Sequence, residues 1–576
     1  MSRSRWFSLP AFALATLVAC ALWWWQGRAA DVVDAQTAKV PCLSYAPYRD
    51  GQSPFDPNLV IPPAQIEEDL RALASHTSCI RTYATEQGLT EVPRIAQAIG
   101  LRVLLGAWIG SNPANNQHEL TKAIDLANRY PETIEAVIVG NEVLLRREQP
   151  AERLAALIDQ TRAAVPVPVT YADVWEFWVQ NQELADHVDF VTIHTLPYWE
   201  DEPIAVGQAI NHVIETWRHM RDLFSGKPVM IGEAGWPSAG RMREGALPSL
   251  LNQARFVRGL LVAAKRDGFR INFIEAFDQP WKRELEGTVG AYWGFFSSDR
   301  KAKFELSGPV ARDPWWFCKL IIASTLTGIA ILIAALRQRF TPFAWLTLAC
   351  ASQAVAGSWL LAVSDLMVVS GSAVDWIVGV IQLCTAAALP LLIFAHTLRA
   401  KDAQRRPQAV PAEAILEILR TRRWTKSPPF TLMFGITRLV LLVGAAATTL
   451  ALAFDPRYRD FPIALYAAPS ILLVSVAWLD WRARDTRTLV DRPNGREEHL
   501  LGWLLLAGGL AVLAREGFEN IQAMAWTGIT VCLGASALIN GAGSAQAVPR
   551  LQPDGAQCSQ DQSDRRSPGG IENKAR

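Results

Sequence analysis

The chain has 576 residues, half of them hydrophobic, with 22 tryptophans and a formal net charge of +1. Its length indicates more than one domain, and its apolar fraction excludes a disordered or collagen-like chain. The near-zero net charge argues against a nucleic-acid-binding protein, which needs a basic surface, and eight cysteines in so long a chain do not make a disulfide scaffold.

The N-terminus carries a candidate targeting segment. Two arginines precede an apolar run, Phe7–Trp25, and two alanines follow it. This order predicts a signal anchor or a cleaved signal peptide over residues 1–30. Leu17–Cys20 also resembles a lipobox, but the apolar stretch after Cys20 disfavours lipidation.

Short apolar runs alternate with amphipathic segments over residues 36–310. The apolar runs are Cys42–Tyr45, Cys79–Tyr83, Val103–Ala107, Ala136–Val139, Val167–Tyr171, Phe190–Ile193, Val229–Ile231 and Ile271–Ala276. The segments between them, such as Ala64–Ala74 and Ser249–Arg266, have helical periodicity. Strands that alternate with helices indicate parallel βαβ units, and eight units in about 270 residues fit an α/β fold of the (β/α)8 TIM barrel type.

Cys42 and Cys79 fall on neighbouring predicted strands. They could form a disulfide in an oxidising compartment, but single cysteines in strands are more often small buried hydrophobes, so both interpretations stay open. The histidines and cysteines show no metal-ligand spacing in the sequence, and we therefore expect neither a metal nor another cofactor.

Two glutamates follow predicted strands at positions suited to catalysis. Glu142 comes after the fourth strand and Glu233 after the seventh, each with a glycine close before it. Because active sites of TIM barrels lie at the C-terminal ends of the strands, we expect both side chains on one face. Two carboxyl groups about 5–5.5 Å apart are typical of a retaining glycosidase, with Glu142 as acid/base and Glu233 as nucleophile. The acid role requires that burial or the charge of Glu233 raise the pKa of Glu142.

The residues around both glutamates closely resemble glycoside hydrolase family 17, the β-1,3-glucanase and β-glucan transglycosylase family. Val139–Val143 is similar to the acid/base motif of that family, and Gly232–Gly240 is similar to its longer and more specific nucleophile motif. The resemblance extends from Val40 to Leu306. The sixth-strand segment Ile193–Trp199 departs from the Asn-and-Tyr version of the plant enzymes.

The resemblance and the positions at strand ends together imply a set of substrate-binding residues. Asn141 would hydrogen-bond the sugar 2-hydroxyl. Arg81 and Tyr83 would keep Glu233 ionised and oriented, although a structural salt bridge inside the barrel is the alternative. Asp173 would bind a hydroxyl or cap a helix.

Sugar rings present apolar C–H faces, so aromatic platforms are expected as well, with Trp199 and Trp281 preferred. Besides Trp199 and Trp281, the other candidates for substrate binding are Trp175, His194, Tyr198, Trp236 and Lys282.

From Trp315 onward the sequence changes, because seven apolar runs follow that are almost free of charge. They are Leu320–Leu336, Phe343–Val363, Trp376–Leu398, Leu439–Phe454, Phe461–Leu479, Leu500–Ala514 and Ala523–Leu538. Several approach the ~20 residues that a membrane-spanning helix needs, which predicts an all-α transmembrane domain of about seven helices over residues 315–545. Buried helices of a soluble domain are the alternative, but such a series would leave almost no polar face.

Basic residues are distributed unequally between the loops of these predicted spans. If Trp315 lies outside, the inner loops carry fifteen lysines and arginines and the outer loops only Arg457, Arg459 and Arg515. This pattern places the barrel outside the cytoplasm and a disordered tail, residues 546–576, inside it. The segment Ala412–Trp424 is expected to form a basic amphipathic helix on the inner leaflet.

The whole architecture resembles bacterial family members of periplasmic β-1,3/β-1,6-glucan synthesis. It implies a multi-pass protein of the bacterial inner membrane whose periplasmic barrel transfers β-1,3-glucan chains, with β-1,6 linkages as one outcome. The expected partners are a β-glucan substrate and acceptor, the lipid bilayer and a membrane glucan synthase, and no nucleic acid. A β-1,3-glucan hydrolase, and a glucan-export component with the barrel as an accessory, are the alternatives.

Overall fold

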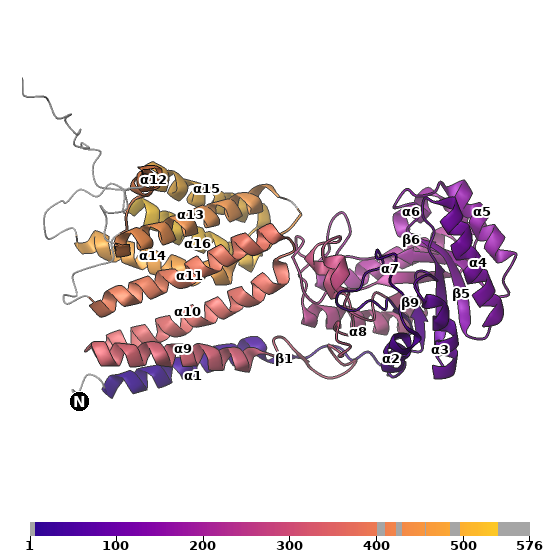
Figure 1. Cartoon of the computed structure of the whole chain (residues 1–576), viewed down its shortest axis with the longest axis horizontal. Coiled ribbons are helices and arrows are strands. Elements are labelled where there is room, and N and C mark those ends of the chain that lie inside the picture. Colours follow the sequence, from indigo (N-terminus) through magenta and orange to yellow (C-terminus); the bar gives the residue numbers. More distant parts are fainter. Residues whose placement is uncertain (1–5, 400–408, 422–428, 456, 484–495, 540–576) are drawn as a thin grey trace, which may run out of the picture.

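The computed structural model describes residues 6–399, 409–421, 429–455, 457–483 and 496–539. They form a barrel and a bundle of long helices that lie end to end (Figure 1). The expected tail, residues 546–576, lies outside the described residues, as does Trp424 at the end of the expected amphipathic helix.

Eight parallel strands close into a barrel in sequence order. They are β2 (Leu43–Ser44), β3 (Cys79–Arg81), β4 (Arg102–Ala107), β5 (Ile134–Asn141), β6 (Val169–Val174), β7 (Val191–His194), β8 (Val229–Ala234) and β9 (Arg270–Phe273). Each overlaps one of the predicted apolar runs, because a parallel strand that is covered on both faces is apolar nearly throughout. The predicted TIM barrel is confirmed.

Helices cover the outside of the barrel. They are α2 (Pro63–Ala74), α3 (Val92–Ile99), α4 (Pro113–Arg129), α5 (Ala151–Arg162), α6 (Trp175–Gln180), α7 (Val206–Leu223) and α8 (Leu250–Asp267), with short 3₁₀ turns η2 (Leu89–Glu91), η3 (Gln182–Asp186), η4 (Pro280–Arg283) and η5 (Thr288–Tyr292). Local sequence signals define some ends: Ser249 caps the first turn of α8 by accepting from the Asn252 N–H, and Gly268 ends that helix with a φ of 76°.

Cys42 and Cys79 form a disulfide at the start of β2 and β3. It lies in a small buried cluster at the end of the barrel opposite the catalytic strand ends, which also includes Leu104, Ile138 and Met230. Of the two interpretations that the sequence left open, the structure has the disulfide.

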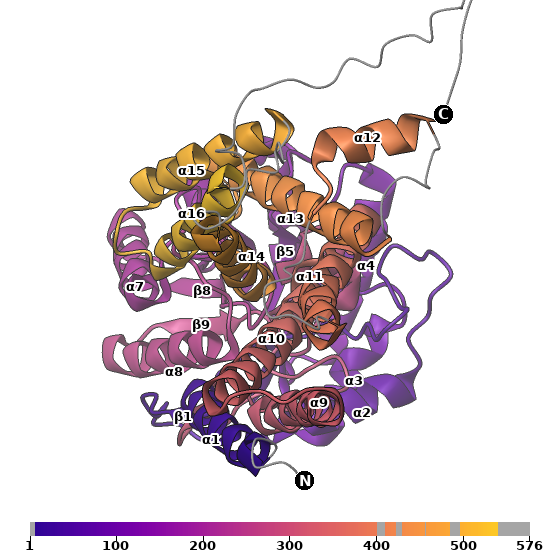
Figure 2. The same ribbon diagram turned by 90° about the vertical axis from the view of Figure 1, so that its left-hand side faces the viewer.

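Two short strands join the barrel to the bundle. β1 (Ala29–Ala30) pairs antiparallel with β10 (Val310–Ala311), so the chain enters and leaves the barrel at one place. The bundle comprises α1 (Ser8–Gly27), α9 (Trp316–Arg337), α10 (Pro342–Val369), α11 (Ala373–Arg399), α12 (Ala412–Thr421), α13 (Pro429–Phe454), α14 (Ile463–Ala483), α15 (Arg496–Glu516) and α16 (Ile521–Ile539). Figure 2 shows α1 beside α9 and α10, although it comes from the other end of the sequence.

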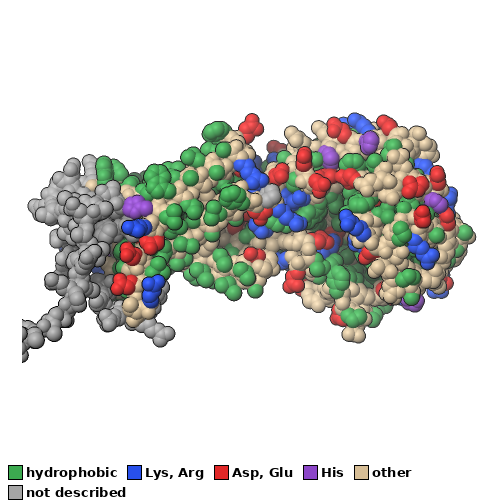
Figure 3. All heavy atoms as spheres, turned by 90° about the horizontal axis from the view of Figure 1, so that it is seen from above, with side chains coloured by type: hydrophobic (Ala, Val, Ile, Leu, Met, Phe, Trp, Pro, Cys, Tyr) green, Lys and Arg blue, Asp and Glu red, His purple; other side chains and the backbone are tan. Residues whose placement is uncertain are grey.

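Seven helices of the described chain are long and apolar enough to cross a membrane: α1, α9, α10, α11, α13, α15 and α16. The seventh apolar run predicted after Trp315 lies on α14, whose apolar part, Ile463–Leu479, is shorter. Large apolar side chains such as Leu22, Leu332 and Leu510 are exposed, and Figure 3 shows hydrophobic side chains over much of the visible surface of the bundle.

The predicted amphipathic helix corresponds to α12. Its buried side chains Ile415 and Ile418 pack with Leu432 of α13, while Leu416 is exposed. Part of the apolar face is therefore covered by the bundle itself.

Candidate active site

The backbone at the end of β5 holds Glu142 in an unusual conformation. Gly140 has a φ of 87° and Glu142 a φ of 53°, the left-handed region that residues with a Cβ seldom adopt. The Glu142 N–H donates to the Ala172 carbonyl at 2.8 Å, which ties this turn to the neighbouring strand β6. Such a conformation is typical of functional sites, where the surrounding structure stabilises it.

The two predicted catalytic glutamates face each other across His194. Carboxylate oxygens of Glu142 and Glu233 lie within 4.8 Å of each other. His194 Nδ1 lies 2.9 Å from Glu142 Oε1, and its Nε2 lies 3.7 Å from Glu233 Oε1. This separation of the carboxylates is close to that of retaining glycosidases and leaves no room for an intervening water molecule of the inverting kind.

Glu233 is oriented by two side chains from β3 and the residues after it. Arg81, which is 1% exposed, lies 3.3 Å from Glu233 Oε1 and also donates to Asn141 Oδ1 at 2.6 Å and to the Gly232 carbonyl at 2.8 Å. The Tyr83 hydroxyl donates to Glu233 Oε1 at 2.7 Å. A cation and a hydrogen-bond donor on the same oxygen hold the carboxylate in the fixed orientation that a nucleophile requires.

The trio of Glu142, His194 and Glu233 has the spacing of a metal site. Arg81, however, already lies beside Glu233 and within 3.3 Å of His194 Nε2. Its positive charge opposes a cation at this position, so the donor set fits an acid/base pair better than a metal.

The pKa of Glu142 differs from the expectation. Burial raises it, but the hydrogen bond from His194 and the charges of His194, Arg146 and Arg81 outweigh burial and lower the pKa overall. The expected raised pKa is therefore wrong for this structure. His194 is fully buried, whereas the Glu142 side chain is 22% exposed. Of the two groups, only Glu142 is open to the cleft, so a proton that the pair shares reaches a substrate through Glu142.

Asp173 has a structural position instead of the predicted contact with a sugar or a helix. Its Oδ2 accepts from the Tyr171 hydroxyl and from the Leu144 N–H, the latter at 3.2 Å, and its Oδ1 accepts from the Val174 N–H at 2.8 Å. Burial raises its pKa to about 6. Asp173 thus holds the loop that follows Glu142, and α6 begins without a side-chain cap.

The predicted aromatic platforms separate into two groups. Trp175, Trp199 and Trp281 are partly buried, and Trp199 stacks on Trp293 at a centroid distance of 6.4 Å. Tyr198 and Trp236 are fully buried, and their polar atoms donate to the carbonyls of Arg241 and Leu247, respectively. Their expected contact with sugar is therefore corrected to a packing role.

Lys282 lies 3.3 Å from both carboxylate oxygens of Glu275, a residue that the sequence did not single out. Glu275 is 1% exposed, and burial raises its pKa to about 8. Burial and then the charges of Glu233 and Glu142 raise the pKa of Glu286, so this side chain also belongs to the site.

Sequence reasoning also missed Trp108. It follows β4 directly and is 41% exposed, with the Arg146 guanidinium 4.2 Å from the ring centroid. Trp108 lies just after a strand, and the other tryptophans were predicted as sugar platforms because of this same position. Its exposed ring is suited to stacking on a sugar.

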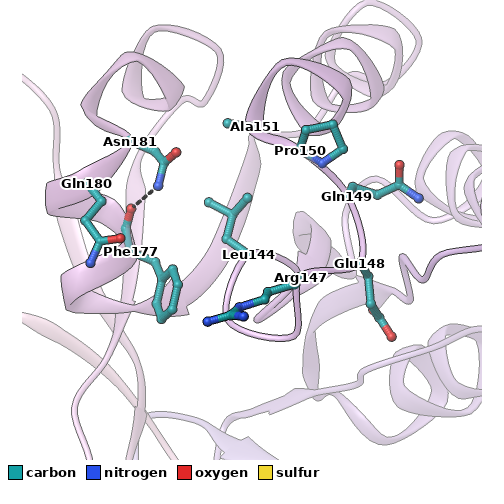
Figure 4. Close-up of a pocket in the computed structure, with 9 residues that line it drawn as sticks. All are labelled: Leu144, Arg147, Glu148, Gln149, Pro150, Ala151, Phe177, Gln180 and Asn181. Carbon is teal, nitrogen blue, oxygen red and sulfur yellow. Dashed lines mark hydrogen bonds between the residues drawn. The ribbon is translucent and has the colours of Figure 1, made fainter.

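A pocket of about 480 Å³ lies beside this site (Figure 4). Its first lining residue, Leu144, comes two residues after Glu142. The pocket is lined by Leu144 and residues 147–151 after β5, and by Phe177, Gln180 and Asn181 from α6 and the residue after it. Its amides, its charged groups and one aromatic ring are of the kinds that bind sugars, but neither catalytic glutamate lines it.

Comparisons with known proteins agree with this chemistry. Residues 42–294 match the model of the BtgE/BtgC glycoside hydrolase domain. The chain is 28% identical over 271 residues to the glucan 1,3-beta-glucosidase of Candida albicans, which covers 42% of this chain and 85% of that protein. It is 29% identical over 259 residues to that of Schizosaccharomyces pombe, which covers 42% and 79%.

Among solved structures, the family 17 β-1,3-glucanosyltransferase of Rhizomucor miehei is 27% identical, with a TM-score of 0.41 over 46% of this chain and 94% of that chain. The matched domain and the curated relatives show that the barrel is similar to glycoside hydrolases that act on β-1,3-glucan, and its two motifs resemble those of glycoside hydrolase family 17. The barrel is therefore a glycosidase or transglycosylase domain.

Proposed function

We propose that this protein is a membrane-anchored, retaining β-glucan transglycosylase that acts on β-1,3-glucan chains. The observation that carries the proposal is the close pair of Glu142 and Glu233, with Arg81 and Tyr83 on the nucleophile. The names of the relatives, glucan 1,3-beta-glucosidase and β-1,3-glucanosyltransferase, support the substrate class and both reaction outcomes.

In the first half of the reaction, the Glu233 carboxylate attacks the anomeric carbon and the glycosidic C–O bond breaks. Glu142 donates a proton to the leaving oxygen, and the proton comes from the pair that Glu142 forms with His194. The product is a glycosyl ester on Glu233 and a shortened glucan. Asn141, held by Arg81, is placed to bind the 2-hydroxyl of the sugar that carries the developing charge.

In the second half, a hydroxyl of another glucan attacks the anomeric carbon of the ester. Glu142 accepts the proton of this hydroxyl, the ester bond breaks, and Glu233 leaves as a carboxylate. If water attacks in place of the glucan, the reaction is hydrolysis. We propose transfer as the main outcome, with a β-1,3 or β-1,6 bond formed according to the acceptor hydroxyl that attacks.

The proposed location is the bacterial inner membrane, with the barrel in the periplasm and a glucan synthase as a neighbour. The apolar helices support a membrane anchor, and the excess of basic residues in one set of loops supports this orientation. The Cys42–Cys79 disulfide supports an oxidising compartment for the barrel.

Product length tests the proposed reaction. The full chain in detergent, incubated with a laminari-oligosaccharide of single length, should produce oligosaccharides longer than the substrate. Linkage analysis of these products would then distinguish β-1,3 from β-1,6 bonds. Products that are all shorter than the substrate would make the protein a hydrolase.

Glu233→Gln should abolish both transfer and hydrolysis, because an amide cannot attack the anomeric carbon. Glu135→Gln is the matched control, since Glu135 pairs with Arg270 at the starts of β5 and β9, at the end of the barrel opposite Glu142 and Glu233. Residual activity of the Glu233 variant near the wild-type level would reject the assigned nucleophile.

A further inference from the structure

The connection between α13 and α14 contacts the barrel directly. We call residues 457–460 the outer loop, and residues 235–249, between β8 and α8, the rim loop. The Arg459 N–H donates to the Met242 carbonyl at 2.8 Å, and the Met242 N–H donates to Asp460 Oδ1 at 2.8 Å. Arg241 Nε donates to Asp460 Oδ2 at 2.5 Å. The rim loop is therefore held by backbone and side-chain bonds from the bundle.

The outer loop is itself fixed to the bundle. Arg459 is 2% exposed, and its guanidinium pairs with Glu516 of α15 at 2.8 Å and donates to the Leu452 carbonyl of α13 at 3.2 Å. A buried arginine with this many acceptors is rigid. Movement of the outer loop would thus require movement of two long helices.

A second contact joins the bundle to the residues after β9. Arg283 donates to the carbonyls of Met367 and Ser370, at 2.9 and 2.6 Å, at the C-terminal end of α10. A cation is favourable at this end of a helix, where backbone carbonyls have no partner within the helix. Arg283 follows Lys282, which pairs with the buried Glu275.

Tyr458 lies at the edge of the catalytic face. Its hydroxyl is 3.1 Å from the position that a Cβ would occupy on Gly287, and Arg241 lies 4.2 Å from its ring centroid. Gly287 directly follows Glu286, a buried carboxyl group whose pKa is raised first by burial and then by the charges of Glu233 and Glu142. The Tyr458 hydroxyl therefore lies beside the residue that follows Glu286.

Arg241 also contacts the aromatic residues of the cleft, through its backbone carbonyl. The Arg241 carbonyl accepts from the Tyr198 hydroxyl at 2.7 Å. Tyr198 packs edge-on against Trp199 and Trp293, the stacked pair in which Trp199 is a preferred sugar platform. Asp460 thus connects to a predicted sugar-contacting side chain through two residues.

We propose that the helical bundle is part of the glucan cleft. The outer loop positions the rim loop through Asp460, and Tyr458 bounds the cleft on the side of β8 and β9. Trp108 follows β4, which pairs with β5, and Figure 1 shows β5 on the side of the barrel away from the bundle; the Trp108 side chain is exposed. Tyr458 therefore limits how many sugar units bind toward the bundle, and Asp460 is a positioning residue. This inference rests on the proposed action on glucan.

The first test measures how the full chain in detergent cleaves laminari-oligosaccharides of graded length. Tyr458→Ala should shift the preferred cleavage position and change KM for the longer substrates by about threefold to tenfold, the effect of one aromatic contact. Phe518→Ala is the matched control, because Phe518 is an exposed aromatic residue in the neighbouring connection of the same end of the bundle. An identical cleavage pattern in the Tyr458 variant and the wild type would overturn the role of Tyr458.

The second test does not depend on activity. In Asp460→Ala, amide hydrogen exchange should become faster at Met242 and along the rim loop, because the acceptor of the Met242 N–H is removed. Asp455→Asn is the control, since the Asp455 side chain accepts only from Arg457 of its own connection among the described contacts. Unchanged exchange in the rim loop would overturn the positioning role. A wild-type protein that is inactive on β-1,3-glucan would instead reject the proposed function, and with it the cleft assignment.

Discussion

At the scale of single residues, the site depends on how buried charges are shared. Arg81 contacts Asn141, Glu233 and His194 at once, so one cation orients both the nucleophile and the residue beside the acid. His194 then bridges the two glutamates. Removing Arg81 or Glu233 alone leaves the other buried group without its ion-pair partner, which costs more than the lost contact alone.

His194→Gln should raise the pKa of Glu142. The substitution removes the charge and changes the hydrogen bond that lower this pKa, and burial, which raises it, remains. The pH dependence of inactivation by a carbodiimide, which reacts with protonated carboxyls, measures the effect as a midpoint at higher pH. His187→Gln is the control, because His187 pairs with Asp159 away from the site. A midpoint that stays the same would contradict the role given to His194.

Asp173→Asn should stabilise the protein more at neutral pH than in acid. The pKa of Asp173 is raised to about 6 in the folded state, so its ionisation above that pH costs folding free energy, and below its unfolded pKa there is no cost. The gain relative to wild type should grow between pH 4 and pH 7, to at most about 3 kcal/mol. Thermal unfolding of both proteins across this range measures it, with the exposed Asp50→Asn as the control. A stability difference that does not vary with pH would reject the raised pKa.

At the scale of elements, the barrel is closed differently at its two ends. The C-terminal strand ends carry the candidate catalytic groups, whereas the opposite end carries the Cys42–Cys79 disulfide and a small apolar cluster. The disulfide joins β2 to β3 across α2, where β2 has only two residues and few ladder hydrogen bonds. The covalent bond compensates for a short strand.

Cys42→Ala should therefore lower the stability of the barrel by about 2–4 kcal/mol, the usual effect of a disulfide that closes a loop of this size. A lower Tm is expected for the variant and for the wild type treated with a reductant. Cys318→Ala, an exposed cysteine of α9, should leave Tm unchanged. Equal Tm values with and without reductant would show that the bond does not stabilise the fold.

At the scale of the whole molecule, the bundle has one end against the barrel and the other away from it (Figure 1). The connections at the barrel end include Ser370 and Asp460, which contact barrel residues. The three basic residues that the sequence placed in outer loops lie in or beside these same connections. The contacts therefore put against the barrel the same loops that the charge pattern predicts to lie outside the cytoplasm.

This orientation predicts the activity of reporter fusions. A reporter that is active only outside the cytoplasm should be active when fused after Ser370 and inactive when fused after Gln338, because these two residues follow α10 and α9 at opposite ends of the bundle. The result follows from the excess of basic residues that favours retention of loops in the cytoplasm. The reverse pattern of activity would invert the proposed topology.

Much of the fold could be predicted because its signals are local. Each barrel strand overlaps an apolar run of the sequence, Glu142 directly follows β5, and Glu233 lies at the C-terminal end of β8. The position of a side chain at a strand end also predicts which barrel face it occupies. The apolar helices after Trp315 are visible for the same reason, since a surface in contact with lipid must be apolar over a full span.

The amino-acid sequence was sufficient to predict the barrel, the apolar bundle and the candidate catalytic pair. Three features became visible only from the packing of the elements: the lowering of the pKa of Glu142 by His194, the burial of Trp236, and the contact of Asp460 with Arg241. The physical reason is the range of the interactions. Periodicity reports which face of one element is covered, but burial of a given side chain and pairing of charges more than 200 residues apart depend on how separate elements pack.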